Sequence, residues 1–454
     1  MALGTERIRK LLMQYALPAI IAMTASSLYN MIDSIFIGHG VGALAISGLA
    51  LTFPLMNLSA AFGSLVGVGA SAIISMRLGQ RDYESASTVL GHVITLNVII
   101  GALFALVTLI YLDPILYFFG ASEATISYAR EYMVVILLGN IITHLFLGLN
   151  AVLRASGHPL KSMYATLFTV ALNTLLDPLF IYGFGWGIQG AAIATILVQI
   201  LALGWQLRFF SRGSELLHFR RGIYRLRRKI VRDILSIGLS PFLMNLAACF
   251  IVILINKGLK AYGGDLMIGA YGIVNRLSFF FVMIVMGINQ GMQPIAGYNY
   301  GARNFDRVRK VLWMTVWWSV ATTTLGFVIC ELFPYQVVQI FVSEDGTGNA
   351  TALIEASARG LRKLVLMLPI VGFNIVAGNF FQHIGKPKRA ILLSVSRQML
   401  FIVPLLFILP RWWGGDGVWY SIPIADFTSS VLAAILLALQ LRKLRENPSQ
   451  EKSI

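Results

Sequence analysis

The 454-residue chain has little charge: only 12% of its residues are Asp, Glu, Lys or Arg, whereas 57% are hydrophobic. A soluble protein carries roughly twice that share of charged residues. Long apolar runs follow one another along the sequence, and the segments between them are too short to form a soluble domain. These shortages exclude a soluble globular protein and indicate an all-α integral membrane protein with many spans.

Cysteine and catalytic motifs are scarce as well. The two cysteines, Cys249 and Cys330, lie in apolar runs, which predicts free thiols that pack as small hydrophobic groups. The sequence has no G-x-S-x-G, no H-E-x-x-H and no cluster of Cys and His, so we do not expect an enzyme. It also lacks G-x-x-x-x-G-K-[ST], which excludes an ATP-driven pump within this chain.

Twelve apolar stretches are long enough to cross a bilayer as helices. We place them near residues 14–37, 48–76, 90–112, 127–150, 161–183, 187–209, 233–256, 267–296, 311–333, 358–383, 390–410 and 417–440. A basic connector at 210–232 divides the chain into an N-lobe at 1–209 and a C-lobe at 233–441, and a tail follows at 442–454.

Lys and Arg are distributed unevenly over the segments between the spans. Of the 36 basic residues, 27 lie in the N-terminal segment, the loops after spans 2, 4, 8 and 10, the connector and the tail. Such a bias indicates that these segments and both termini are cytoplasmic. The net charge of +16 is therefore explained by topology in a cell membrane and by contact with anionic lipid, and we expect no nucleic-acid partner.

The two halves of the sequence repeat each other. Residues 77–83 (RLGQRDY) match 299–305 (NYGARNF), and 156–159 (SGHP) match 384–387 (IGKP). Because each half has six spans, both halves insert the same way up. We expect two six-helix lobes that are related by a pseudo-two-fold axis along the membrane normal, with the substrate site between them.

Span 5 contains the most informative polar residues. Asn173 and Asp177 are four residues apart and therefore share one helix face. Pro178 follows directly, removes a backbone donor and should loosen the helix at membrane depth. An acid in hydrocarbon costs several kcal/mol, so this one is a functional candidate. The alternative is a carboxyl group that only hydrogen-bonds to a neighbouring helix.

Two further spans of the N-lobe supply matching groups. Asp33 lies in span 1, and Thr195 lies in span 6 among small residues that allow close helix approach. Together with Asn173 and Asp177 they form a set of oxygen ligands, which suits Na⁺ or a proton held between two carboxylates. Separate hydrogen bonds between helices at each position remain the alternative.

The C-lobe has a different pattern. Span 7 contains no carboxylate, whereas Arg397 in span 11 and Asp426 in span 12 are placed to form an ion pair, more in keeping with a structural contact than with transport. Aromatic, methionine and polar residues near the boundary between the lobes are candidates for an adaptable substrate cavity. These cavity candidates are Tyr29, Asn30, Phe53, Met56, Met283, Met286, Gln290 and Gln293.

The chain resembles the MATE (multidrug and toxic compound extrusion) transporters over nearly its full length. The resemblance rests on Asn-Met-Ile-Asp at 30–33, the repeated segments around Gly79 and Gly301, Leu-Arg-Ala-Ser-Gly at 153–157 and Asn-Thr-Leu-Leu-Asp-Pro at 173–178. The stretches at 287–301 and 396–398 look most like the MepA-type bacterial branch.

The resemblance implies a V-shaped pair of lobes that alternate between outward-open and inward-open forms. It implies that Asp33, Asn173, Asp177 and Thr195 form the cation site of the N-lobe, since all four match the family pattern. An inward H⁺ or Na⁺ gradient would then drive the expulsion of amphipathic, cationic small molecules by a monomer that needs no other cofactor. A second branch of the family uses an acid in span 7, which this chain lacks.

Two related functions remain open. A lipid-linked oligosaccharide flippase would share the two-lobe architecture, but such proteins often carry several cavity cations for a pyrophosphate. Here Arg276 and Arg397 are the embedded cations, against three embedded acids, Asp33, Asp177 and Asp426, which favours a cationic cargo. An exporter of an endogenous metabolite is the second alternative.

Overall fold

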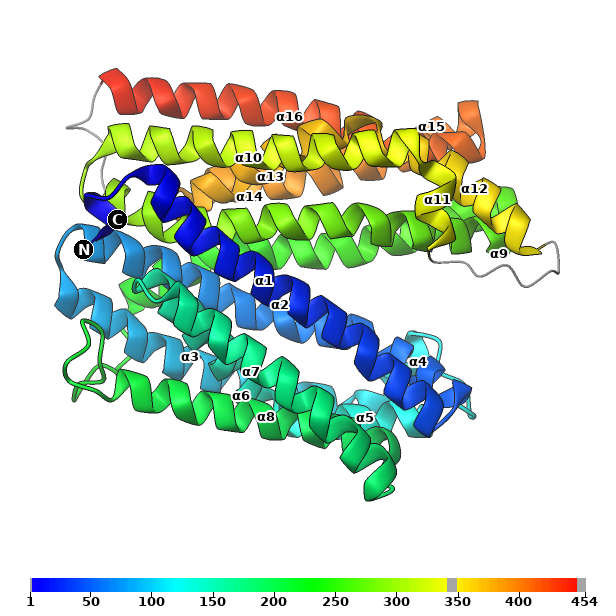
Figure 1. Cartoon of the computed structure of the whole chain (residues 1–454), viewed down its shortest axis with the longest axis horizontal. Helices are drawn as coiled ribbons and strands as arrows, with labels where there is room; N and C mark the ends of the chain where they lie inside the picture. The colour runs from blue at the N-terminus through cyan, green and yellow to red at the C-terminus, as the bar shows by residue number, and fades with distance from the viewer. Residues whose placement is uncertain (1, 341–348, 447–454) are drawn as a thin grey trace.

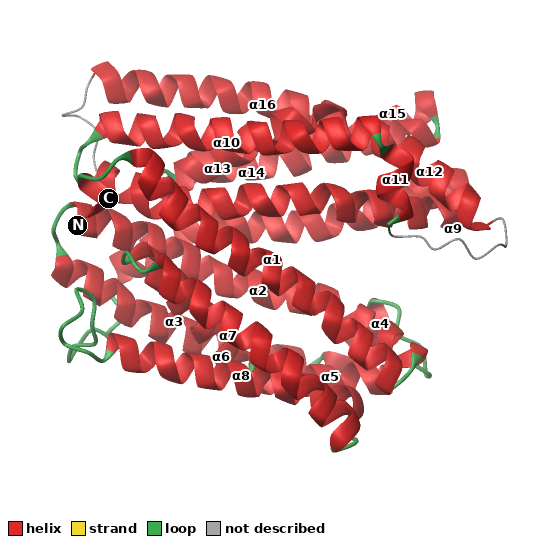
Figure 2. Cartoon of the chain, in the orientation of Figure 1, coloured by secondary structure: helices red, strands yellow, loops and turns green. Residues whose placement is uncertain are grey.

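Helices form all the regular secondary structure in the described part of the chain, residues 2–340 and 349–446 (Figure 2). The computed structural model arranges them in two stacked bundles, one from each half of the sequence (Figure 1). The first helix begins and the last helix ends at the same end of the molecule. The bundles lie close together at that end and diverge toward the other, so the expected two-lobe architecture is present.

In the N-terminal bundle, α1 and α2 are the two helices that face the other bundle (Figure 1). A short 3₁₀ turn, Ala2–Gly4, precedes it, and a π-helical turn, Leu179–Gly183, separates its last two α-helices. Its α-helices are α1 (Ile8–Gly40), α2 (Ala43–Gly79), α3 (Tyr83–Ile110), α4 (Leu112–Phe118), α5 (Ile126–Leu138), α6 (Asn140–Ala155), α7 (Pro159–Pro178) and α8 (Gly187–Phe210).

The C-terminal bundle begins with a helical hairpin, α9 (Arg228–Gly301). Its two arms, Arg228–Gly264 and Leu266–Gly301, meet at Gly264, whose φ of 64° is outside the helical region. The later elements are α10 (Phe305–Leu332), α11 (Pro334–Gln339), α12 (Asn349–Leu364), the 3₁₀ turn Val365–Met367, α13 (Leu368–His383), α14 (Pro387–Val395), the π-helical segment Ser396–Ile402, α15 (Val403–Trp413) and α16 (Gly415–Glu446).

The number of membrane-crossing helices agrees with the twelve spans expected. Within the described residues, eleven helices are long and apolar enough to cross a bilayer, and the pair α5 and α6 makes the twelfth. That pair differs from the expectation of one continuous helix at 127–150, because it bends by 56° at Gly139. A Cβ at Gly139 would lie 2.3 Å from Ile196 Cδ1, so the bend brings this backbone against α8.

Most helices extend past the predicted limits of the spans. The first arm of α9 covers Arg228–Gly264, whereas the apolar run predicts 233–256. Hydrophobicity marks the part of a helix that contacts lipid, but the backbone hydrogen bonds continue into the charged segments on either side. The sequence therefore locates the bilayer better than it locates the helix ends.

The lobes meet mainly through α2 and α9. At the end nearest the termini, a Cβ on Gly79 would lie 1.9 Å from the Tyr298 carbonyl oxygen, and a Cβ on Gly301 would lie 2.0 Å from that of Met76. These two glycines occupy matching positions of the internal repeat. The repeat therefore builds a symmetric crossing in which only glycine leaves room for the opposite backbone.

Candidate functional site

Three helices of the N-lobe, α1, α7 and α8, bring polar side chains together inside the bundle. The Asn173 amide nitrogen donates hydrogen bonds to the Tyr29 hydroxyl and to Thr195 Oγ1, the latter at 3.2 Å. The Tyr29 hydroxyl lies 3.3 Å from Thr195 Oγ1, which donates in turn to the Ala191 carbonyl at 3.1 Å. These bonds tie the three helices together at one level of the bundle.

Two acids complete this group, which we call the N-lobe polar cluster: Tyr29, Asp33, Asn173, Asp177 and Thr195. Asp33 is 7% exposed, and Asp177 is fully buried. Their carboxyl groups lie beside each other and beside the Tyr29 hydroxyl. The structure therefore brings together all four residues expected to bind the coupling cation.

The cluster contains several oxygens whose hydrogen-bonding capacity is unused. Asp33 Oδ1, both carboxyl oxygens of Asp177 and Asn173 Oδ1 are buried, and none has a hydrogen-bond partner of acceptable geometry within the described residues. Buried polar atoms without partners are rare because each one costs free energy. Four such atoms in one cluster indicate a site that a bound cation or proton would complete.

The local sequence explains why Asp177 is available at this point. Pro178 is the last residue of α7 and cannot donate the next helical hydrogen bond. The chain continues as a π-helical turn over Leu179–Gly183 before it reaches α8. Single π-helical turns in membrane and soluble helices are frequent at functional sites. The proline thus loosens the helix directly beside the buried acid, as its position in the sequence predicts.

The chemistry of the cluster restricts the ion that it can hold. No group of three or more His, Cys, Asp and Glu side chains converges anywhere in the described chain. The cluster therefore offers two carboxylates with neutral amide and hydroxyl oxygens, a set that suits an alkali ion or a proton better than a transition metal. Asp33, Asn173, Asp177 and Thr195 would hold a Na⁺ ion, and either acid could hold a proton.

Two tyrosines of this region have a place that the sequence reasoning did not assign. Tyr29, predicted as a cavity residue, belongs to the cluster itself, and its position four residues before Asp33 puts both on one face of α1. Tyr132 on α5 is 3% exposed and lies near both acids. The sequence did not single out Tyr132, because a tyrosine in an apolar span gives no indication of which helix it faces.

The remaining cavity candidates lie on α2 and α9, which face each other across the boundary between the lobes. Phe53 is 44% exposed, and the Sδ atom of Met56 accepts a hydrogen bond of 3.7 Å from Thr52. Met283 and Met286 are half-buried. Asn30 falls outside the residues whose side chains are described.

The two glutamines of α9 join the lobes. Gln290 Nε2 lies 3.3 Å from Met23 Sδ on α1, and Gln293 donates to Ser71 Oγ on α2. Gln293 is only 5% exposed, so in this arrangement it is buried in the lobe boundary and does not line an open cavity. Its burial follows from the close crossing of α2 and α9, and its role in a substrate cavity stays a prediction.

The C-lobe contains an embedded ion pair. Arg397 Nε donates to Asp426 Oδ1 at 2.6 Å, and the Asp426 side chain is 4% exposed. Arg397 belongs to the π-helical segment Ser396–Ile402, and Asp426 belongs to α16. The structure thus joins spans 11 and 12 through the two charges that the sequence singled out.

Comparison with known proteins identifies the family to which this arrangement belongs. The chain matches the MatE family over residues 18–179 and 237–408, which together make up most of its length. It belongs to the MATE family of transporters. Family membership places the chain among transporters and not among enzymes.

Relatives of this MATE chain with curated names match it over almost its whole length. It is 30% identical over 435 residues to the multidrug export protein MepA of Staphylococcus aureus strain N315, with 95% of this chain and 94% of that protein covered. It is 28% identical to MepA of Staphylococcus haemolyticus, with 94% and 93% covered.

Solved structures share the fold. An outward-facing multidrug resistance MATE transporter of the MOP superfamily superposes with a TM-score of 0.91 at 25% identity, with 98% of both chains covered. A MOP superfamily transporter from Pyrococcus furiosus gives a TM-score of 0.92 at 24% identity over the same share of both chains. The two-lobe arrangement is therefore that of the MATE fold.

Proposed function

We propose that this MATE chain is a secondary active multidrug efflux transporter of the cell membrane. It exchanges inward-moving H⁺ or Na⁺ for outward-moving amphipathic, cationic small molecules. The observation that carries the proposal is the pair of buried acids, Asp33 and Asp177, three of whose carboxyl oxygens are, like Asn173 Oδ1, without a hydrogen-bond partner among the described residues. The relatives at 28–30% identity, which are described as multidrug export proteins, support the class of cargo.

The coupling mechanism follows from the geometry of the N-lobe polar cluster. Two carboxylates that lie side by side in a low-dielectric interior repel each other, and a bound cation or proton removes that repulsion. Because Asp33 is on α1 and Asp177 is on α7, the bound ion favours their approach and thereby changes how the two helices pack. Tyr29 and Asn173 connect the same helices through a hydrogen bond, so the change is shared by the whole cluster.

Exchange requires that the ion bind the two lobe arrangements with different affinity. The π-helical turn after Pro178 provides a point where α7 can change its path without breaking a regular helix. The helix α1 contacts both α7 and the α9 hairpin of the other lobe. A shift of α1 upon ion binding would therefore change the contacts at the boundary between the lobes, where the cargo is expected to bind.

The charges inside the membrane favour a positively charged cargo. Arg397, one of the two embedded cations, is neutralised by Asp426, whereas Asp33 and Asp177 have no basic partner within the described chain. An anionic lipid-linked oligosaccharide would instead need unpaired cations between the lobes, which makes the flippase the second candidate. A metabolite exporter would use the same site for a narrower range of cargo. We propose that the protein acts as a monomer.

Topology completes the proposal. The bias of Lys and Arg supports a cytoplasmic position for both termini. Because the lobes converge at the end where the termini lie (Figure 1), this arrangement would be open toward the outside of the cell. The variant Ser214→Cys, in the exposed connector of a chain whose Cys249 and Cys330 are replaced by serine, tests this directly. It should react with a membrane-impermeant maleimide only after the cells are opened, and labelling of intact cells would overturn the topology.

The function is tested by transport in sealed proteoliposomes. A fluorescent organic cation serves as cargo, and a pH gradient or a Na⁺ gradient is imposed separately. Gradient-driven movement of the cation supports the antiporter and identifies its ion. If neither gradient moves the cation while the protein remains folded, the multidrug assignment is wrong, and fluorescent lipid-linked oligosaccharide becomes the next cargo to assay.

A further inference from the structure

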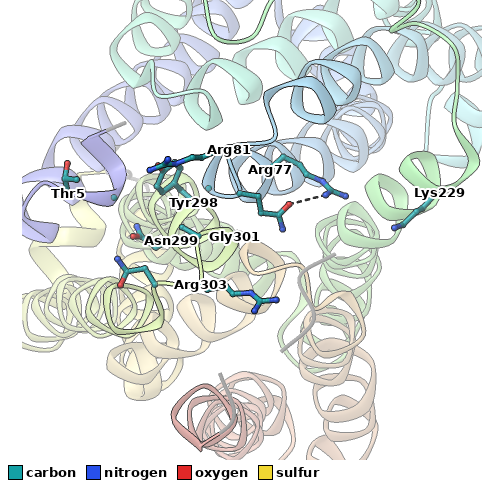
Figure 3. Close-up of a pocket in the computed structure, with 13 residues that line it drawn as sticks. Thr5, Arg77, Arg81, Lys229, Tyr298, Asn299, Gly301 and Arg303 are labelled. Atoms are coloured by element: carbon teal, nitrogen blue, oxygen red, sulfur yellow. Dashed lines mark hydrogen bonds between the residues drawn. The ribbon is translucent and has the colours of Figure 1, made fainter. Parts of the chain in front are cut away.

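A basic cavity lies between the lobes at the end where the chain begins and ends. Its volume is about 850 Å³, and it is lined by the turn after α2, the turn after α9, the first residues of the chain and the start of α9. Four cations line it, Arg77, Arg81, Lys229 and Arg303, and no acidic side chain does. Figure 3 shows Arg77, Lys229 and Arg303 arranged around one open space.

Three of these cations have no carboxylate partner within the described chain. Arg81, Lys229 and Arg303 are exposed and make no ion pair with the described residues, whereas Arg77 donates to Gln80 at 3.1 Å and lies 3.7 Å from Asp82. Elsewhere on the same face, basic residues pair with acids, as Lys10 does with Glu6. Positive charge that gathers in a concave site without counter-charges attracts a multiply charged anion.

The backbone at two of these positions points to a role for the arginines themselves. Arg81 and Arg303 have φ values of 60° and 56°, in the left-handed region that L-residues other than glycine and asparagine rarely occupy. Each follows the end of a helix, α2 or α9, at the point where such a cap normally carries glycine. The two residues occupy matching positions of the internal repeat, so both halves of the chain have arginine where glycine would be less strained.

We propose that this cavity, defined by Arg77, Arg81, Lys229 and Arg303, binds a phosphate-bearing anion that bridges the two lobes. Guanidinium groups bind phosphate oxygens in pairs of parallel hydrogen bonds, and an ammonium group adds a compact charge. The volume is large enough for a di- or triphosphate. Its other lining residues include the polar Thr5, Gln80 and Asn304, which favours a soluble phosphate over a lipid with its acyl chains.

The consequence concerns the balance between lobe arrangements. Arg77 and Arg81 lie at the end of α2 in the N-lobe, whereas Lys229 and Arg303 lie at the two ends of the α9 hairpin, with which the C-terminal bundle begins. Separation of the lobes at this end would divide the site, so a bound anion stabilises the arrangement in which the lobes are together there. This part rests on the proposed alternating mechanism, but anion binding itself does not depend on it and is measured separately.

The test compares two variants with equal loss of charge. Arg81→Asn/Arg303→Asn removes the two arginines and places a residue that tolerates a positive φ at both positions. Arg212→Asn/Arg225→Asn removes two exposed arginines of the connector that do not line the cavity. Binding of pyrophosphate is measured by calorimetry on protein in phosphatidylcholine nanodiscs, at constant ionic strength. A second arm uses nanodiscs that contain phosphatidylglycerol and no soluble phosphate, with thermal stability as the readout.

We expect saturable pyrophosphate binding by the wild type and by the connector variant. The affinity of the cavity variant for pyrophosphate should be lower by roughly tenfold or more. If pyrophosphate does not bind in the first arm, but phosphatidylglycerol stabilises the wild type and not the cavity variant in the second, the phosphate comes from a lipid headgroup. If all three proteins respond alike to both anions, or respond to neither, the proposal is wrong. Equal melting temperatures of the two variants without ligand exclude misfolding as the cause of a loss.

Discussion

The glycine pair at the crossing of α2 and α9 allows a quantitative prediction about the lobe arrangement. A Cβ on Gly79 or Gly301 would lie 1.9 or 2.0 Å from a carbonyl oxygen of the other lobe. Carbon and oxygen atoms that are not bonded need about 3 Å or more. The double variant Gly79→Ala/Gly301→Ala therefore has to separate these backbones by roughly 1 Å, because neither neighbour is a flexible side chain that could move aside.

The cost of this separation falls on one arrangement only. Overpacking a tight contact costs about 1–3 kcal/mol. Only the arrangement with the lobes together at this end makes the contact, so the equilibrium between arrangements should shift by roughly 5- to 150-fold toward separation. The helices themselves should gain slightly, since alanine favours helix more than glycine does.

The shift is measured by the distance between spin labels on the two lobes. We choose Glu84→Cys at the start of α3 and Lys388→Cys at the start of α14, both exposed, in a chain whose free cysteines Cys249 and Cys330 are replaced by serine. Pulsed electron paramagnetic resonance should show a population at longer distance in the alanine variant. The control is Gly204→Ala/Gly378→Ala, at helical glycines with open space around them. Identical distance distributions in the test and control variants would show that the glycine contact does not determine how closely the lobes approach.

Three other predictions concern the C-lobe, the pH dependence and the N-lobe polar cluster. Arg397→Gln leaves the buried Asp426 without its partner, so it should destabilise the protein by about 3–5 kcal/mol. The exchange Arg397→Asp/Asp426→Arg should recover part of the melting temperature. If the exchange variant is as unstable as the single variant, the two residues do not act as a pair. The pKa of His158, in the turn before α7, is lowered by burial and by Lys161, although Glu215 opposes this shift. The folded protein thus binds a proton there less readily than the unfolded chain does, so the melting temperature should fall as the pH drops below about 6.5. The fall should be smaller in His158→Gln, and parallel curves of melting temperature against pH for the two proteins would contradict the prediction. Tyr29→Phe removes the hydroxyl that Asn173 bonds, and ion-driven transport should fall about tenfold with little change in folding, while full transport would show that the hydroxyl is dispensable.

Composition and periodicity were sufficient for the architecture. Twelve apolar runs, a basic connector and the matched segments at 77–83 and 299–305 predicted two six-span lobes, and the structure and its relatives agree. These signals work because a bilayer imposes length and polarity on every span. The polar residues that the structure brings together were also visible in the sequence, since Asp33, Asp177, Arg397 and Asp426 are charged residues within apolar runs.

Features that depend on packing between distant segments were not predictable. The 56° bend at Gly139 lies where the backbone is close to Ile196 of α8, and a glycine within an apolar run does not by itself predict a bend. Tyr132, on α5, lies near the two acids of α1 and α7, a contact between helices that are distant in the sequence. Gln293 was expected in a cavity, but the close approach of α2 and α9 buries it against Ser71.

In the proposed antiporter, Asp33 and Asp177 couple ion entry to cargo export. The most direct test is gradient-driven transport in proteoliposomes by Asp177→Asn, next to Glu84→Gln, which neutralises an exposed acid at the start of α3. We expect Asp177→Asn to lose gradient-driven export while it remains folded and still binds the fluorescent cation, and Glu84→Gln to transport like the wild type. Undiminished export by folded Asp177→Asn under the same gradient would show that Asp177 does not couple ion entry to cargo export.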